Sequence, residues 1–221
     1  MITLFFAIWM VSPGNRPPEQ PVVENLPVVQ DVPDGWTSLF DGKTLAGWEV
    51  VRYTGCGEPY VKDGSLILPM ADKGLMTGVR CTGDSLPVCN YIIYYEARRV
   101  AGDDIFAGLT FPYKDTYASL IFGGWRNRVN GLSSIGGYDA SENETGQFFS
   151  LSNNQWYPVQ LRVTTDSIRA DIAKGTFVAL ATAGKDIHLR DESLDTGFTL
   201  WTYLSTGEIR NLRIKKLSPS I

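Results

Sequence analysis

Residues 35–50 read GWTSLFDGKTLAGWEV, the stretch of the chain that points most directly to its fold. Two tryptophans, Trp36 and Trp48, bracket a turn that contains the pair Asp41-Gly42. An Asp-Gly pair between apolar segments is a strong turn signal, because glycine adopts positive φ without a steric penalty. The stretch also follows a proline-rich leader. It therefore predicts the point at which the folded part of the protein begins.

Beyond this stretch, short β-favouring segments alternate with turn signals. Strands are predicted at 65–69, 75–80, 91–100, 105–111, 116–122, 156–164, 167–172, 177–181, 198–204 and 208–217. Turns rich in glycine and aspartate separate these segments, and no long window holds a 3.6-residue period. The pattern predicts an all-β protein built as an antiparallel sandwich.

Three of the predicted strands show which residues share a face. In the segments 156–164 and 167–172, apolar residues occupy every second position, which predicts a half-buried hairpin. Segment 91–100 differs, because Glu96 and Arg98 share a face with apolar and aromatic neighbours. Two interpretations of this semi-buried polar face stay open: a ligand groove, or a structural ion pair.

The composition argues against several functional classes. The net charge of −4 disfavours nucleic-acid binding, which usually needs a basic surface. A single histidine, His188, disfavours a metal site with several histidine ligands. We find no phosphate loop and no dinucleotide fingerprint. The length of 221 residues, 43% of them hydrophobic, suits one domain with a substantial core.

The N-terminal region predicts export. Residues 1–11 form the apolar core of a signal peptide, which is too short to span a bilayer. Residues 12–34 hold half of the chain's 12 prolines and predict an extended linker. We expect a folded domain at 35–218 in a secreted or periplasmic protein, with no membrane span in its mature form.

The protein has three cysteines, and their spacing does not suggest a metal site. They are Cys56, Cys81 and Cys89. Export would favour one disulfide, because oxidising compartments allow the bond to persist. Proximity in the sequence favours Cys81–Cys89, with Cys56–Cys81 second, and either pairing leaves one free thiol.

The opening stretch resembles the start of the 3-keto-disaccharide hydrolase domain family, formerly a domain of unknown function. That family opens with Trp or Phe, then Ser-Leu-Phe-(Asn/Asp)-Gly-Lys, then Gly-Trp. The segment YVKDGSL at 60–66 resembles its next element, and GEIRNLRIKKL at 207–217 resembles its closing strand. The middle of the chain resembles a subgroup common in planctomycete-like secreted proteins. The similarity covers residues 35–217.

The resemblance implies a concanavalin A-like lectin/glucanase β-jelly roll, in which two curved antiparallel sheets leave a concave face that can hold a sugar. It also implies a hydrolase that acts on glycosides or 3-keto-glycosides. Residues 104–109 lack the asparagine that better-studied relatives carry there. A second hypothesis therefore stays open: a non-catalytic carbohydrate-binding or adhesion module with a laminin-G/lectin-like fold.

Each hypothesis selects candidate residues. A 3-keto group acidifies the hydrogen on C2, so hydrolysis needs a base and a group that polarises the ketone oxygen; Glu96 and Arg98 are the candidates. Sugar binding needs aromatic rings that stack on sugar faces and polar groups that satisfy hydroxyls. The candidate ligand-binding residues are Tyr113, Tyr117, Trp125, Arg126, Asp139 and Glu142. No cofactor is required, and Asp103 and Asp104 are candidate ligands for a divalent cation such as Ca²⁺, which usually takes six to eight oxygens.

Overall fold

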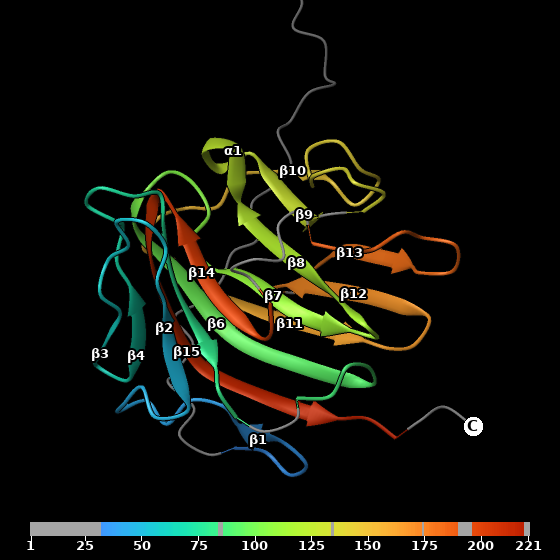
Figure 1. Ribbon diagram of the computed structural model, residues 1–221, viewed down its shortest axis with the longest axis horizontal. Coiled ribbons are helices and arrows are strands. Elements are labelled where there is room, and N and C mark those ends of the chain that lie inside the picture. Colours follow the sequence, from blue (N-terminus) through green and yellow to red (C-terminus); the bar gives the residue numbers. More distant parts are fainter. Residues whose placement is uncertain (1–31, 84–85, 134, 174, 190–195, 219–221) are drawn as a thin grey trace, which may run out of the picture.

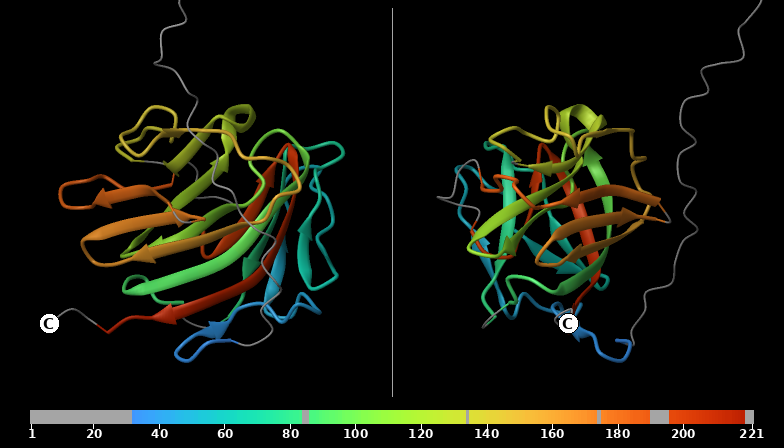
Figure 2. Two further views of the ribbon diagram at one scale, coloured as in Figure 1. Left: turned by 180° about the vertical axis from the view of Figure 1, so that it is seen from behind. Right: turned by 90° about the vertical axis from the view of Figure 1, so that its right-hand side faces the viewer.

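The computed structural model describes residues 32–83, 86–133, 135–173, 175–189 and 196–218. Figure 1 shows two antiparallel β-sheets packed face to face, and Figure 2 shows the same layers from two further directions. The predicted jelly-roll sandwich is therefore confirmed. The expected signal-peptide core at 1–11 and most of the expected linker, residues 12–31, lie outside the described residues. Within the described ranges, no helix is long and apolar enough to cross a membrane.

The first sheet, which we call sheet A, is built around two long strands that are visibly curved in Figure 1. Its order is β13 (Gly175–Ala181), β12 (Ser167–Ile172), β11 (Tyr157–Val163), β6 (Tyr91–Gly102), β15 (Ser205–Lys216), β4 (Ser65–Leu68) and β3 (Tyr60–Lys62). A short strand, β1 (Thr37–Ser38), pairs with β15 outside this path. Strand β15, near the C-terminal end, thus lies in the interior of the sheet.

The second sheet, sheet B, covers one face of sheet A. Its order is β10 (Gln147–Phe148), β9 (Val129–Ser133), β8 (Thr116–Gly123), β7 (Gly108–Tyr113), β14 (Thr199–Tyr203), β5 (Met76–Cys81) and β2 (Trp48–Val51). A single turn, α1 (Gly124–Asn127), separates β8 from β9. The pair Gly123-Gly124 predicted a turn at this point, but not its left-handed conformation.

The core lies between the two sheets and follows the alternation of the strands. On β6, Ile93, Tyr95 and Ala97 are almost fully buried against sheet B, whereas Glu96 and Arg98 lie on the opposite face. The β11–β12 hairpin has the predicted alternation, and its register pairs Val163 with Ile168. Apolar residues at every second position therefore define one continuous core, as the pattern predicted.

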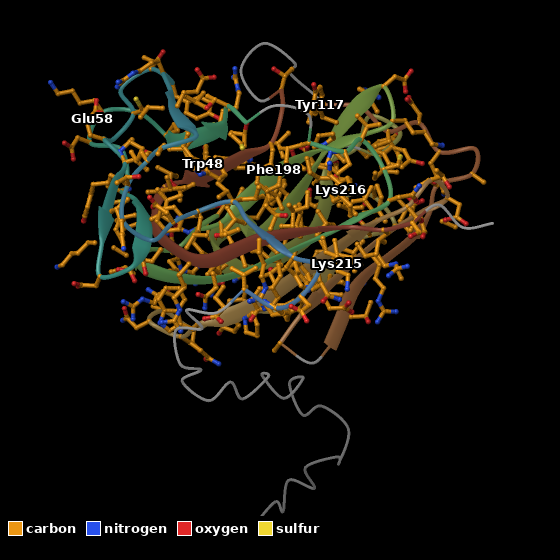
Figure 3. The ribbon with its side chains drawn as sticks, turned by 90° about the horizontal axis from the view of Figure 1, so that it is seen from below. Trp48, Glu58, Tyr117, Phe198, Lys215 and Lys216 are labelled. Atoms are coloured by element: carbon orange, nitrogen blue, oxygen red, sulfur yellow. The ribbon has the colours of Figure 1, made fainter. Side chains whose placement is uncertain are left out.

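The opening stretch lies against the closing strand. β1 pairs with β15, with Thr37 opposite Ile214 and Ser38 opposite Arg213. The indole Nε1 of Trp48 donates a 2.8 Å hydrogen bond to the carbonyl of Leu39. The Trp48 ring lies inside the sandwich, 6.0 Å from the ring of Phe198 (Figure 3).

Two expectations about local structure need correction. The strand expected at 105–111 begins only at Gly108, because the Ile105 N–H donates to Oδ1 of Asp104 at 3.0 Å instead of to a strand partner. All three cysteines are free thiols, so neither disulfide forms in the structure. Cys81 ends β5 of sheet B and Cys89 lies before β6 of sheet A, and both pack against the core as partly buried apolar groups.

Candidate functional site

Glu96 lies on the face of sheet A that points away from sheet B, and it is only 1% exposed. Its Oε2 atom accepts a 2.7 Å hydrogen bond from Nε of Arg210, which makes a buried ion pair. Its Oε1 atom accepts hydrogen bonds from the Asn211 amide at 3.0 Å and from the Tyr94 hydroxyl at 3.1 Å. The carboxylate is therefore engaged on both oxygens.

Arg98 forms a second ion pair beside the first. Its Nε atom contacts the carboxylate of Glu208, which is opposite Arg98 in the β6–β15 register. The ring of Trp156 covers both arginines, with guanidinium carbons 4.6 Å (Arg98) and 4.0 Å (Arg210) from its centroid. Each member of the Glu96/Arg98 pair thus binds a partner on β15, and this geometry favours the structural ion-pair interpretation.

The Tyr94 phenol extends the same polar layer. Burial raises its pKa to about 12, and the nearby carboxylate of Glu96 adds to the shift. The guanidinium of Arg213 lies 4.2 Å from the Tyr94 ring centroid and 5.2 Å from that of Trp36. The phenol therefore stays protonated at neutral pH and can donate its hydrogen bond to Glu96.

A second polar cluster lies at the end of β8, where α1 is a left-handed turn. Trp125 and Arg126 have φ/ψ angles of 50°/54° and 59°/51°, and Asn127 follows at φ 65°. Left-handed conformations are costly for residues with a Cβ, and three in succession are rare. Surrounding contacts must therefore hold this backbone in place.

The side chains of Asp104 and Asn127 hold the backbone of the turn in place, and we call their contacts the clamp. Oδ2 of Asp104 accepts the backbone N–H of Arg126 at 2.9 Å, and Oδ1 accepts that of Ile105 at 3.0 Å. The Asn127 amide binds Leu151 twice, accepting its N–H at 3.0 Å and donating to its carbonyl at 2.9 Å. Both ends of the turn are thereby fixed to neighbouring loops.

Arg99 supports this clamp from the interior. The side chain is nearly fully buried and donates to the carbonyl oxygens of Asp104 at 3.1 Å and Leu151 at 2.7 Å, and to Oδ1 of Asn153 at 2.6 Å. Burial lowers the pKa of its guanidinium, and Asp103 and Asp104 oppose the shift. One buried arginine thus joins the loops on either side of the turn.

The clamped turn presents exposed aromatic side chains. Trp125 is 41% exposed, and Phe148 on the neighbouring strand β10 is 67% exposed. The backbone places Phe148 opposite Val129, which in turn bridges to Gly124. We call Trp125, Arg126 and Phe148 the aromatic end of the molecule; it lies around α1 and β10 at the top of Figure 1.

The structure brings some of the predicted site residues together here. Asp103 pairs with the exposed Arg126, whose Nη2 lies 3.1 Å from Oδ2, and Asp104 holds the backbone of the same residue. Asp139 and Glu142 share a turn in the loop before β10, closed by a 2.9 Å backbone hydrogen bond. Across the described ranges, no group of three or more His, Cys, Asp or Glu side chains could hold a metal ion.

Other predicted residues lie elsewhere. Tyr113 is buried, and its hydroxyl binds Oγ1 of Thr182 at 2.6 Å. Tyr117 lies near the start of β8, whereas Trp125 follows its end; eight residues of strand span about 26 Å. Figure 3 shows Tyr117 at the edge of the molecule. These two tyrosines therefore do not join the aromatic end, and Glu96 and Arg98 lie on the other sheet.

Sequence reasoning missed several residues of both clusters. Arg210 and Asn211 belong to the closing motif, but no local pattern links them to Glu96, which lies more than a hundred positions earlier. Phe148 went unnoticed because a strand of two residues, β10, is too short to give a periodic signal. The acidic loop that precedes β10 in the sequence, with Asp139 and Glu142, was the signal that could have drawn attention to this strand.

Comparisons with known proteins establish the fold. No family model matches the chain, and neither does any curated protein. Among solved structures, the Crh5 transglycosylase in complex with NAG matches 88% of this chain and 89% of its own at 10% identity, with a TM-score of 0.58. Carbohydrate binding module CBM66 from Bacillus subtilis matches 77% and 96% at 12% identity and TM-score 0.51. Domain 4 of AbnA, an extracellular arabinanase of Geobacillus stearothermophilus in complex with arabinotriose, matches 84% and 93% at 14% identity and TM-score 0.52. At these identities the shared feature is the β-sandwich itself.

Proposed function

We propose that this protein binds a carbohydrate at its aromatic end. The observation that carries the proposal is the left-handed turn that presents Trp125 and Arg126. Each left-handed residue with a Cβ costs about 1–2 kcal/mol, and the clamp by Asp104 and Asn127 keeps three of them in place. Strain that the surrounding structure maintains occurs preferentially at ligand sites.

The side chains of this end suit a sugar. The exposed ring of Trp125 offers an apolar surface on which the C–H face of a pyranose can stack. The Arg126–Asp103 pair supplies donors and acceptors for neighbouring hydroxyl groups. Solved structures with this fold include a carbohydrate-binding module and a domain in complex with arabinotriose, which supports the proposal at the level of fold.

Hydrolysis of glycosides or 3-keto-glycosides is the second candidate, and the resemblance of the opening, middle and closing motifs to the 3-keto-disaccharide hydrolase domain family supports it. A general base must reach its substrate's proton. Glu96 is 1% exposed and bound to Arg210, Asn211 and Tyr94. We therefore favour binding over catalysis. The apolar run at residues 2–11 supports our further proposal that the protein is secreted or periplasmic.

A glycan array probed with the full chain tests the binding proposal. The Trp125→Ala variant should weaken binding to its best glycan about tenfold, because losing a stacked ring costs roughly 1–1.5 kcal/mol. Tyr60→Ala is the matched control, since Tyr60 is similarly exposed (48%) but lies on β3 of sheet A. Equal loss in both variants, or unchanged binding after Trp125→Ala, would refute the aromatic end as the site.

The catalytic alternative needs a separate measurement. Incubation with a 3-keto-glucoside, with and without a divalent cation, should give no turnover if the protein only binds. Turnover that disappears in a well-folded Glu96→Gln variant would instead establish the hydrolase and overturn our preference.

A further inference from the structure

A separate hollow of about 490 Å³ lies where the two ends of the folded chain meet. The residues that line it are far in the sequence from those of the aromatic end, and most of them lie on or beside strands of sheet A. Its wall is formed by β1, by two Asp-Gly turns and by the irregular part of β15. The residues that line it include Ser38, Asp41, Gly42, Lys43, Asn211 and Arg213.

Irregular backbone shapes this hollow. Gly42 and Gly64 have φ values of 71° and 78°, and a Cβ on Gly42 would lie 3.5 Å from the carbonyl oxygen of Gly64. The two Asp-Gly turns therefore touch. On β15, the register with β6 shifts between Arg210 and Arg213, and Asn211 takes a positive φ of 55°. Such bulges re-aim side chains and are common beside functional sites.

Arg213 gives the hollow an uncompensated positive charge. Its guanidinium is held over the rings of Tyr94 and Trp36, which fix the cation without neutralising it. Its Nε atom is buried and has no hydrogen-bond partner among the described residues. A buried donor without an acceptor carries a desolvation cost, and a ligand oxygen would relieve it only if the side chain turned this atom towards the hollow.

The other charged groups around the hollow do not cancel this charge. Asp41 is the carboxylate in its wall, and it accepts the N–H groups of Lys43 and Thr44 at 2.8 Å and the Thr44 hydroxyl at 2.7 Å. These bonds lower the pKa of Asp41 and commit its charge to its own turn. Behind the wall, Glu96 is paired with Arg210. Among the described residues that line the hollow, the two cations Lys43 and Arg213 therefore outnumber the one carboxylate, Asp41.

We propose that this hollow binds a monosaccharide-sized anion, a sugar acid or a sugar phosphate. Its volume falls in the range of small-ligand sites, roughly 300–1,000 Å³. Arginine binds carboxylate and phosphate oxygens through paired N–H groups, and Lys43 adds a second cation at the rim. Ser38 and Asn211 also line the hollow; the Ser38 hydroxyl donates to the Phe40 carbonyl and the Asn211 amide donates to Glu96, while their oxygen atoms can accept hydrogen bonds from ring hydroxyls. This site is independent of the aromatic end, so either can fail without the other.

Protein-observed NMR at low ionic strength tests the site with four probes: D-glucuronate, D-glucose 6-phosphate, D-glucose and inorganic phosphate. We expect at least one of the two sugar anions to shift the amide signals of Gly42 and Gly64, and comparison of the two identifies whether carboxylate or phosphate is preferred. D-glucose and inorganic phosphate should bind at least about tenfold more weakly. Added salt should weaken the binding, because the attraction is electrostatic.

Variants localise the effect. Arg213→Gln should lower the affinity at least about tenfold and Lys43→Gln several-fold, whereas Arg169→Gln, an exposed arginine of the same sheet, and Trp125→Ala should leave it unchanged. If Arg213→Gln fails to fold, the exposed Lys43→Gln variant decides. The proposal is overturned if neither sugar anion shifts these signals at tens of millimolar, if D-glucose or inorganic phosphate binds as tightly as both, or if the Lys43 and Arg213 variants bind like the wild type.

Discussion

Replacing Glu96 with alanine should cost the protein several kcal/mol of folding free energy. The substitution removes a buried carboxylate and leaves the guanidinium of Arg210 without its 2.7 Å partner. Breaking a buried ion pair from one side typically costs about 3–5 kcal/mol, because the remaining charge stays desolvated. Asn211 and Tyr94 also lose their acceptor, which places the expected value in the upper part of that range. For a domain of this size the melting temperature should fall by about 6–20 °C.

Urea unfolding of the full chain measures this loss as a lower midpoint with an unchanged slope. Arg169→Ala is the control, because Arg169 forms an exposed ion pair with Asp171, and such pairs contribute about 0–1 kcal/mol. The double variant Glu96→Ala/Arg210→Met should recover part of the loss, since it removes both buried charges and leaves an apolar side chain beside Trp156.

A loss of less than about 1 kcal/mol in Glu96→Ala, the value of an exposed pair, would refute a buried, stabilising ion pair. Simple additivity of the two substitutions in the double variant would refute it too, because a real pair must show coupling. Either result would return Glu96 to consideration as an accessible, reactive carboxylate.

Two further predictions concern single side chains. Tyr94 has a pKa of about 12 in the folded protein, whereas the phenol of the unfolded chain titrates near pH 10. The contribution of Tyr94 to stability should therefore be complete below pH 10 and should be lost as the pH rises towards 12. The difference in urea midpoint between wild type and Tyr94→Phe should shrink over that interval, and a constant difference would contradict the raised pKa. Gly108→Ala should destabilise the fold by about 1–3 kcal/mol, because a Cβ there would lie 2.5 Å from the Trp201 ring. Gly175→Ala is the control: a Cβ at Gly175 would meet no described atom closer than 3.9 Å, so the urea midpoint should hardly change.

The sequence predicted the sheets well where local alternation controls them. In β11 and β12 every second residue is apolar, and the structure pairs these residues in one half-buried hairpin. In β6 the same rule correctly separated Tyr95 from Glu96. A period of two survives in the sequence because neighbouring side chains must point to opposite faces.

Contacts between distant segments could not be predicted in this way. The partner of Glu96 is Arg210 on β15, and its identity depends on strand order and on a bulge. The pair Gly123-Gly124 predicted a turn before Trp125, but not its left-handed form, because Asp104 and Asn127 impose that form through contacts with other loops. Proximity of Cys81 and Cys89 in the sequence was misleading for a related reason, since Cys81 ends β5 of sheet B whereas Cys89 lies in the loop before β6 of sheet A.

The interior position of β15 also constrains how the protein can be made. Ile209 on this strand lies opposite Leu66 of β4 and Ala97 of β6. Strands β4 and β6, both from the first half of the chain, therefore cannot be joined in one sheet until residues 205–216 have been synthesised. Until then β4 and β6 keep open edges that invite pairing with other chains. Contacts across such sequence distances fold slowly, so the nascent protein spends its most aggregation-prone interval before this one strand arrives.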